Sequence, residues 1–355
     1  MDTIFFSIFN FFLLISSCNI ILADEFPSWV LVANRHLLQS TPPKADIVVA
    51  QDGSGNYTTI SEAVAAAAKK TDGKRLVIYV KQGVYKENVE INISNLTFIG
   101  DGMDATIITG NRSARDGFKT FNTATFGVSG YGFIARDITF ENTAGPENNQ
   151  SVALRSNSHR SVFYNCSFKG YQDTLYVYRK VQFYRNCDIY GTVDFIFGYA
   201  AVVFQNCNIY IRKPLSYQKN TITAHGRKSL EEKTGIIIHN SRITAAADMI
   251  GVKSIESYLG RPWEKYSRTV FMKCTIDELI HPAGWLPWNG SFALNTLYYG
   301  EYLNTGSGAN TNRRVKWPGY HVIQNSTEAS KFTVDNFVSG NSWIPATGVP
   351  FEGGL

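Results

Sequence analysis

Two acidic residues occupy matching positions in a short internal repeat. Segments 165–173 and 186–194 share Asn, Cys, Gly and Asp in the same frame, 21 residues apart. A repeat of about 20 residues is typical of the coils of a parallel β-helix. Equivalent residues on successive coils of such a fold lie about 4.8 Å apart, a separation at which two carboxylates can share one reaction. We therefore expect Asp173 and Asp194 to be catalytic.

The elements that must position these carboxylates are short strands. A third copy of the repeat begins at Phe204, and weaker echoes follow at Asn240 and Lys273, each an apolar, β-rich run beside a polar residue. Between residues 75 and 140, short β-branched and aromatic runs alternate with Gly, Asn and Asp. Their connections are too irregular for a series of two-residue hairpins, so parallel strands fit better. The sequence predicts an all-β solenoid of parallel strands.

Both ends of the solenoid need a cover, because an open coil exposes its core and a strand edge. Thr59 or Ser61 is placed to cap an Ala-rich stretch, 62–69, which predicts a short helix at the N-terminal end. After Gly300 the repeat weakens. Residues 329–344 are expected to form short C-terminal helices packed along the outside of the solenoid.

The first residues have the features of a targeting segment. Residues 5–15 are dominated by Phe, Leu and Ile, and small residues follow before Ala23. We interpret 1–23 as a secretory signal peptide, although its start has Asp2 and no Lys or Arg. The alternative is a membrane anchor, but the apolar run is shorter than the ~20 residues of a spanning helix. Residues 24–45 are expected to be a linker or processed segment, and 46–355 the catalytic domain.

Charge and composition narrow the possible partners only a little. The chain has 355 residues, of which 44% are hydrophobic, enough for a large core. Asp2 is the only charged residue among residues 1–23, so their removal raises the formal charge from +5 to +6. This modest positive charge suits a protein that binds an extracellular polyanion. The chain has no concentrated stripe of Lys and Arg, which disfavours nucleic acid as a partner. Eight Asn-x-Ser/Thr triplets fit a secreted glycoprotein, and a monomer is the default expectation.

The cysteines leave two interpretations open. Cys166, Cys187, Cys207 and Cys274 remain after the signal peptide, and the first three share one repeat position. The spacing of adjacent coils permits a disulfide between Cys166 and Cys187. Small apolar side chains stacked inside the solenoid explain the pattern equally well. No CxxC or HxxxH spacing accompanies the thiols, so no metal site is expected.

Five separate segments resemble the signature blocks of plant pectin methylesterases. They are Gly-Val-Tyr-Lys-Glu at 83–87, Gln-Ser-Val-Ala-Leu at 150–154, Gln-Asp-Thr-Leu-Tyr at 172–176, Asp-Phe-Ile-Phe-Gly at 194–198 and Leu-Gly-Arg-Pro-Trp at 259–263. The resemblance covers residues 46 to about 345. It implies a right-handed parallel β-helix that hydrolyses the methyl esters of polygalacturonate (pectin, homogalacturonan) in the plant cell wall, with an Asp nucleophile and no cofactor.

The matching positions imply a division of labour that chemistry supports. Asp194 would be the nucleophile that attacks the ester carbonyl. The planar fork of Arg261 can hold that carboxylate bidentately and fix its aim. Asp173 would take the higher pKa of the coupled pair, donate a proton to departing methanol and later accept one from water.

The remaining site residues would bind the oxyanion and the sugar. Gln150 and Gln172 supply neutral amide donors suited to a tetrahedral oxyanion. Four aromatic residues are expected to line the groove and stack on sugar rings: Tyr176, Phe197, Trp263 and Trp285. Trp288 competes with Trp285 for this role.

The chain departs from the family pattern at a few positions. Tyr199 stands where the family often has Asn, and His225 where Gln is usual. His225 titrates near neutrality if it lies near the site, and a structural histidine with satisfied hydrogen bonds is the alternative. Many relatives begin with an inhibitor-like pro-domain, whereas only about twenty residues separate the signal peptide from Asp46. We expect folding without a covalent inhibitor, while a separate inhibitor protein can still bind the groove.

Two other functions stay open. A polygalacturonase-like glycosidase also uses paired acids on a parallel β-helix, but it does not explain Gln150, Gln172 and Arg261. A non-catalytic pectin-binding protein on the same scaffold is the second alternative.

Overall fold

The structure is a computed structural model that describes residues 45–70 and 73–355. The predicted signal peptide, and the linker up to residue 44, lie outside the described residues.

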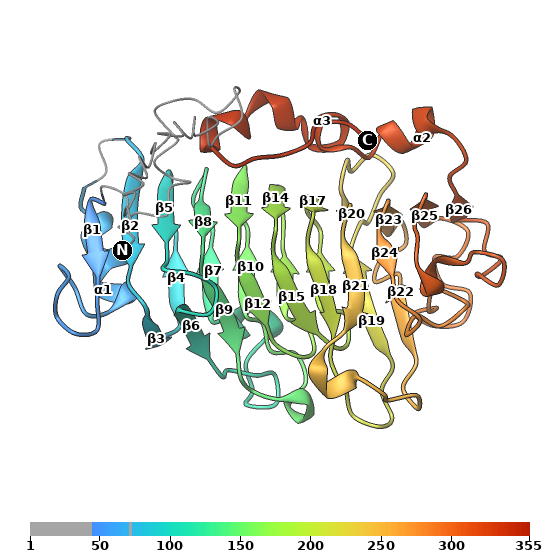
Figure 1. The fold of residues 1–355 in the computed structure, drawn as a ribbon, viewed down its shortest axis with the longest axis horizontal. Helices are drawn as coiled ribbons and strands as arrows, with labels where there is room; N and C mark the ends of the chain where they lie inside the picture. Colours follow the sequence, from blue (N-terminus) through green and yellow to red (C-terminus); the bar gives the residue numbers. More distant parts are fainter. Residues whose placement is uncertain (1–44, 71–72) are drawn as a thin grey trace, which may run out of the picture.

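The described strands form three parallel sheets that run along one solenoid (Figure 1). Sheet I contains, in spatial order, β1 (Ile47–Val49), β2 (Leu76–Val80), β5 (Leu96–Ile99), β8 (Ile134–Arg136), β11 (Ser161–Tyr164), β14 (Val181–Arg185), β17 (Ala201–Gln205), β20 (Gly235–His239), β23 (Arg268–Met272), β25 (Tyr298–Tyr302) and β26 (Tyr320–Val322). Sheet II contains β4 (Val89–Ile91), β7 (Phe126–Val128), β10 (Leu154–Ser156), β13 (Leu175–Val177), β16 (Ile196–Gly198), β19 (Asn220–His225) and β22 (Ser257–Gly260). Sheet III contains β3 (Gly83–Lys86), β6 (Thr106–Gly110), β9 (Thr139–Asn142), β12 (Ser167–Lys169), β15 (Asp188–Gly191), β18 (Asn208–Ile211), β21 (Arg242–Ala245) and β24 (Thr275–Ile276). The predicted parallel β-helix is confirmed.

The sequence repeat corresponds to one coil of the solenoid. Ser167 pairs with Asp188 in the register of sheet III, which is the 21-residue offset of the repeat. Asn165 and Asn186 have positive φ values of 50° and 53° at the bend between sheets I and III, a conformation that Asn tolerates better than most residues. A Cβ on Gly191 would lie 2.2 Å from the Phe195 Cβ. Backbone bends and close approaches thus explain why Asn and Gly recur in the repeat.

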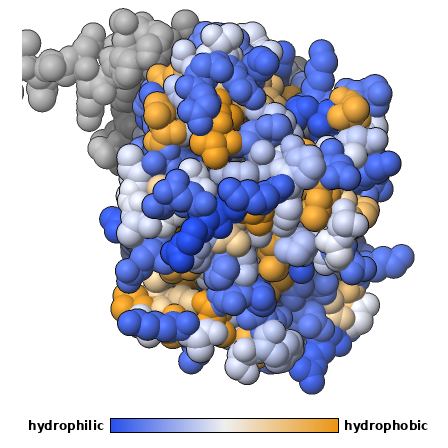
Figure 2. Space-filling model, turned by 90° about the vertical axis from the view of Figure 1, so that its right-hand side faces the viewer, coloured by the Kyte–Doolittle hydropathy of each residue, from blue (hydrophilic) through white to orange (hydrophobic). Residues whose placement is uncertain are grey.

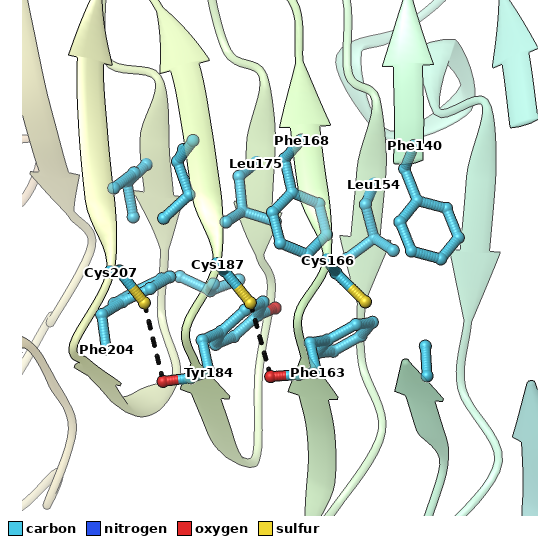
Figure 3. Packing of buried hydrophobic residues seen from close by; sticks show 14 of the residues in the cluster. Phe140, Leu154, Phe163, Cys166, Phe168, Leu175, Tyr184, Cys187, Phe204 and Cys207 are labelled. Carbon is cyan, nitrogen blue, oxygen red and sulfur yellow. Dashed lines mark hydrogen bonds between the residues drawn. The ribbon is translucent and has the colours of Figure 1, made fainter. Parts of the chain in front are cut away.

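The cysteine positions point into the core. Cys166, Cys187 and Cys207 are fully buried and unpaired, so the alternative of stacked thiols holds and the possible Cys166–Cys187 disulfide is absent. The Cys187 Sγ donates to the Phe163 carbonyl at 3.4 Å (Figure 3). Burial raises the thiol pKa of Cys187 well above its usual range. These thiols behave as small apolar side chains next to an aromatic stack.

That aromatic stack follows the solenoid axis. The rings of Phe163 and Tyr184 lie 4.7 Å apart, and those of Tyr184 and Phe204 lie 4.5 Å apart, both nearly parallel. Figure 3 shows these three rings, one each from β11, β14 and β17. The repeated contact of equivalent residues stabilises neighbouring coils against each other.

Short helices cover the solenoid as predicted. Helix α1 (Ile60–Ala67) starts at Thr59, whose side chain accepts a hydrogen bond from the Glu62 amide. Helices α2 (Ser326–Ser330) and α3 (Val334–Val338) lie along the outside of sheet I, at the top of Figure 1. Further single turns of 3-10 helix are η2 (Thr120–Thr123), η3 (Pro146–Asn148), η4 (Ala247–Met249), η5 (Ser307–Ala309), η6 (Gly340–Ser342) and η7 (Pro345–Thr347).

The last residues are fastened to sheet I. The amide of Gln205 donates to the Glu352 carbonyl and accepts from the Glu352 amide, both at 2.9 Å. At the C-terminal end, Arg314 and Glu301 form an ion pair in which each side chain is only 2% exposed. Figure 2 views this end and shows a mainly hydrophilic surface with scattered hydrophobic patches. The core is therefore covered here as well.

Within the part of the chain that the structure describes, no helix is long and apolar enough to cross a membrane.

Candidate active site

Asp173 and Asp194 occupy equivalent positions on adjacent coils. Each lies two residues before its strand, and Leu175 of β13 pairs with Ile196 of β16. Both Asp residues have positive φ, 63° and 51°, a conformation that is uncommon outside Gly, Asn and Asp. Both are largely buried, with 7% and 6% exposure. The predicted pairing of the two carboxylates is thus produced by the register of sheet II.

Arg261 fixes the carboxylate of Asp194. Its Nε donates to Oδ1 at 2.8 Å and its Nη2 donates to Oδ2 at 2.7 Å. Arg261 directly follows β22, two coils beyond β16. Such a bidentate pair holds both carboxylate oxygens in the plane of the guanidinium.

Thr221 is a positioning residue that the sequence analysis missed. Its hydroxyl donates to the Asp194 Oδ1 at 2.7 Å and accepts from the Asp194 amide at 2.9 Å. It lies on β19 and is fully buried. Thr221 and Asp194 are 27 residues apart in the sequence, across an irregular coil. The 21-residue repeat therefore does not reveal their contact. Arg261 and Thr221 together leave Asp194 little rotational freedom.

The environment of Asp173 favours the protonated form of its carboxyl group. Burial raises the pKa of its carboxyl well above the usual range, and the negative charge of Asp194 raises it further. The positive charge of Arg261 opposes these effects only in part. A raised pKa favours the protonated form, which is the form that a general acid requires.

The raised pKa predicts a pH-dependent stability difference between wild type and Asp173→Asn. In the unfolded chain Asp173 ionises near pH ~3.9, whereas folding favours its protonated form. As the pH rises from about 4 toward the folded pKa, this group therefore lowers the free energy of unfolding. Asn does not ionise, so the variant has no such loss. The free energy of unfolding of the variant minus that of wild type should therefore rise from pH 4 to pH 7. Urea unfolding of both proteins at the two pH values measures the difference, and a constant difference would contradict the raised pKa.

Gln150 and Gln172 line the same cleft as the two Asp residues. Both are half-buried, and neither side-chain amide has a hydrogen-bond partner among the residues that the structure describes. The Ser151 amide donates to the Gln172 carbonyl at 3.1 Å, so the two Gln residues come from adjacent coils. Their amide groups are therefore free to bind a ligand that enters the cleft.

The cleft has a volume of about 350 Å³ and brings together nearly all the predicted site residues. Its lining consists of Thr120, Gln150, Gln172, Asp173, Tyr176, Asp194, Phe197, Ala224, Arg261, Trp263 and Trp288. The rings of Tyr176 and Phe197 are stacked at 4.1 Å, and the Trp263 ring lies 6.0 Å from that of Phe197. The cleft thus combines two carboxyl groups with an aromatic wall.

The prediction that Trp285 lines the groove is wrong. Trp285 is 1% exposed, stacks on Tyr299 at 4.1 Å and donates from Nε1 to the Glu301 carboxylate at 3.3 Å. It forms a β-bridge with Gly260 and faces the core. Trp288 takes the predicted place, with 38% exposure and its ring 4.5 Å from the Arg261 guanidinium carbon.

Substitution of the two tryptophans should therefore have different effects. Trp285→Ala is expected to lower the free energy of unfolding by about 3–5 kcal/mol, because it leaves a cavity beside Tyr299. Trp288→Ala should change stability by less than about 0.5 kcal/mol but raise KM, since it removes an exposed wall of the cleft. Denaturant unfolding and steady-state kinetics separate these effects; a stable Trp285→Ala protein with raised KM would contradict the assignment.

His225 lies outside the cleft and is structural. It is fully buried, and its Nδ1 accepts a hydrogen bond from the Arg268 amide at 3.1 Å. Burial lowers its pKa to about 3. His225 therefore stays neutral and does not titrate near neutrality.

Comparison with known proteins decides the family. The pectinesterase family model matches residues 46–341. The chain belongs to the pectinesterase family. It is 61% identical to pectinesterase 2 of Citrus sinensis over 333 residues, which is 94% of this chain and 65% of that protein. It is 62% identical over 337 residues to probable pectinesterase/pectinesterase inhibitor 6 of Arabidopsis thaliana, covering 94% and 59% of the two chains.

A solved structure agrees with this membership. Pectin methylesterase from carrot superimposes with a TM-score of 0.87 at 54% identity, over 89% of this chain and all of the carrot chain. The chain nevertheless spans less than two thirds of the length of the Citrus and Arabidopsis relatives. Among residues 45–70 and 73–355 no group of three His, Cys, Asp or Glu side chains is arranged to hold a metal ion.

Proposed function

We propose that the protein hydrolyses methyl esters of polygalacturonate, releasing methanol and free carboxylates. The observation that carries this proposal is the bidentate Arg261–Asp194 pair beside the buried Asp173, whose pKa is raised. An oriented carboxylate beside a carboxyl group of raised pKa supports nucleophilic attack assisted by a general acid. Membership of the pectinesterase family supports the same activity.

In the first half of the proposed reaction, an Asp194 oxygen attacks the ester carbonyl carbon. The carbonyl oxygen becomes an oxyanion that accepts hydrogen bonds from the amides of Gln150 and Gln172. The bond from carbon to the methoxy oxygen then breaks, and Asp173 gives its proton to that oxygen. Methanol leaves, and the galacturonyl group remains on Asp194 as an acyl-enzyme.

In the second half, water attacks the acyl carbon and gives a proton to the carboxylate of Asp173. The same two amides hold the second oxyanion. The bond to the Asp194 oxygen breaks, which restores the Asp194 carboxylate and releases the galacturonic acid. Asp173 ends protonated, so the cycle is balanced without a cofactor.

The cleft favours an ester over a glycosidic bond. Gln150 and Gln172 are neutral donors suited to negative charge, whereas glycoside cleavage develops positive charge on the sugar. Highly methylated pectin distinguishes the three candidate functions. An esterase releases methanol without lowering viscosity, a polygalacturonase-like glycosidase lowers viscosity, and a non-catalytic binding protein does neither. A fall in viscosity without methanol would overturn the proposal.

We further propose that residues 46–355 form the catalytic domain of a secreted, monomeric cell-wall glycoprotein. The apolar segment 5–15 and the eight Asn-x-Ser/Thr triplets support secretion and glycosylation. A separate inhibitor protein is a proposed partner, because the cleft presents the half-buried Trp263 and the exposed Trp288 for contact.

A further inference from the structure

The residue before Gln150 has an unusual backbone conformation. Asn149 directly follows η3, with φ 61° and ψ −146°. A residue in the ordinary left-handed conformation has a ψ of about +45°. The observed value lies instead at the edge of a region, at ψ of roughly ±150–180°, that essentially only glycine occupies. Asn149 therefore carries backbone strain immediately beside a residue that lines the cleft.

The side chain of Asn149 does not compensate for this strain. Asn tolerates a positive φ where its short polar side chain bonds to the nearby backbone. The Asn149 side chain is exposed, however, and makes no hydrogen bond with any residue that the structure describes. The conformation is therefore held by the surrounding backbone, as is typical of strained residues at functional sites.

Hydrogen bonds on both sides hold the segment that contains Asn149. On one side, the Ala114 amide donates to the Gln150 carbonyl at 2.9 Å. On the other, the Ser151 amide donates to the Gln172 carbonyl at 3.1 Å. The Ser151 hydroxyl also donates to the Asn149 carbonyl at 3.1 Å. Gln150 is thus fastened between a loop and the next coil of the solenoid.

Asn142 ties that loop to the strand that follows Gln150. It lies on β9 and is only 2% exposed. Its side-chain amide donates to the Arg112 carbonyl at 2.9 Å and to the Val152 carbonyl at 3.1 Å. Arg112 precedes Ala114 by two residues, and Val152 follows Gln150 by two. One buried amide therefore holds together the two segments that keep the strained conformation in place.

We propose that Asn149 is a positioning residue for the oxyanion donor Gln150. Its strained backbone turns the chain so that the Gln150 amide stays aimed into the cleft before substrate binds. A donor that is oriented in advance stabilises the transition state without a cost of reorganisation. The inference rests on the proposed esterase function and adds to it the residue that aims one of the two oxyanion donors.

Asn149→Gly and Asn149→Ala in the full chain test this role, because they change the strain in opposite directions. Glycine adopts the observed conformation without strain, whereas Ala is strained in it more than Asn is. The urea midpoint of unfolding should therefore rise in Asn149→Gly and fall in Asn149→Ala. Both variants remove the same Asn-Gln-Ser triplet, so loss of a glycan there would shift the two midpoints in one direction.

The kcat for methanol release should fall about tenfold in both variants, with little change in KM. Glycine admits other backbone conformations and Ala favours them, so in either variant the Gln150 amide leaves its position. A residue that only stabilises the fold would instead give a kcat that follows the midpoint.

The Gln150→Leu background shows whether the effect passes through Gln150. There, Asn149→Gly should leave kcat within about twofold of the Gln150→Leu single variant. Lys273→Gly is the matched control, because Lys273 is exposed and has a φ of 53° at a bend between β23 and β24, away from the cleft lining. It should raise the midpoint and keep the wild-type kcat.

An unchanged kcat in Asn149→Gly, or a tenfold fall that persists in the Gln150→Leu background, would overturn the positioning role. Failure of the wild type to release methanol from highly methylated pectin would instead overturn the proposed esterase function.

Discussion

The Asp194→Asn variant is expected to release methanol at least about 10⁴-fold more slowly than the wild type. Asparagine has nearly the same shape but no carboxylate, so it cannot attack the ester carbonyl. Its amide also turns an N–H toward Arg261, whose Nε and Nη2 both need acceptors. The measurement is kcat for methanol release from highly methylated pectin, with circular dichroism and thermal unfolding to verify the fold.

Asp188→Asn is the matched control for this loss. Asp188 belongs to the same repeat but lies on β15 of sheet III, where its carboxylate accepts from the Asn208 amide at 2.9 Å. It should retain wild-type activity, because its carboxylate faces away from the cleft lining. If folded Asp194→Asn retained most of the activity, the nucleophile would have to be another group.

Loss of either oxyanion donor should give the second largest effect. Gln172→Leu and Gln150→Leu are each expected to lower kcat about 10²–10³-fold. KM should change little, because the oxyanion exists only during the reaction and the ground-state ester carbonyl binds these amides more weakly. Both side chains lack partners within the described structure, so the substitutions leave no buried group unpaired.

The two glutamine variants also test whether the donors act together. In the double variant a combined loss smaller than the product of the single losses would indicate that both amides bind one oxyanion. Gln324→Leu, at an exposed position after β26, is the control and should be active. If the Gln172→Leu and Gln150→Leu variants raised KM at unchanged kcat, these side chains would bind substrate without stabilising the transition state.

The repeat made the fold and the acid pair predictable from the sequence. Asn165 and Asn186 mark the same bend on two coils, and a fixed offset along the chain becomes a fixed distance across a parallel sheet. The same offset places Asp173 next to Asp194. Helix α1 was predictable for a local reason, because Thr59 precedes an Ala-rich run and caps it.

Contacts outside the repeat could not be predicted in this way. Trp285 and Trp288 lie in one irregular segment after Gly284, where no strand periodicity shows which ring faces the core. Thr221 faces Asp194 in the register of sheet II, but the two are 27 residues apart in the sequence, so the 21-residue repeat does not reveal the contact.

The most direct test of the account is oxygen labelling of a methyl-esterified oligogalacturonate in ¹⁸O-water. Attack of Asp194 on the ester carbonyl, followed by attack of water on the acyl-enzyme, predicts ¹⁸O in the new carboxylates, unlabelled methanol and an unchanged chain length. Mass spectrometry of both products measures all three. Label in methanol would indicate attack at the methyl carbon, and shortened chains with label at new reducing ends would indicate glycoside cleavage. Either result would contradict an esterase whose nucleophile is Asp194.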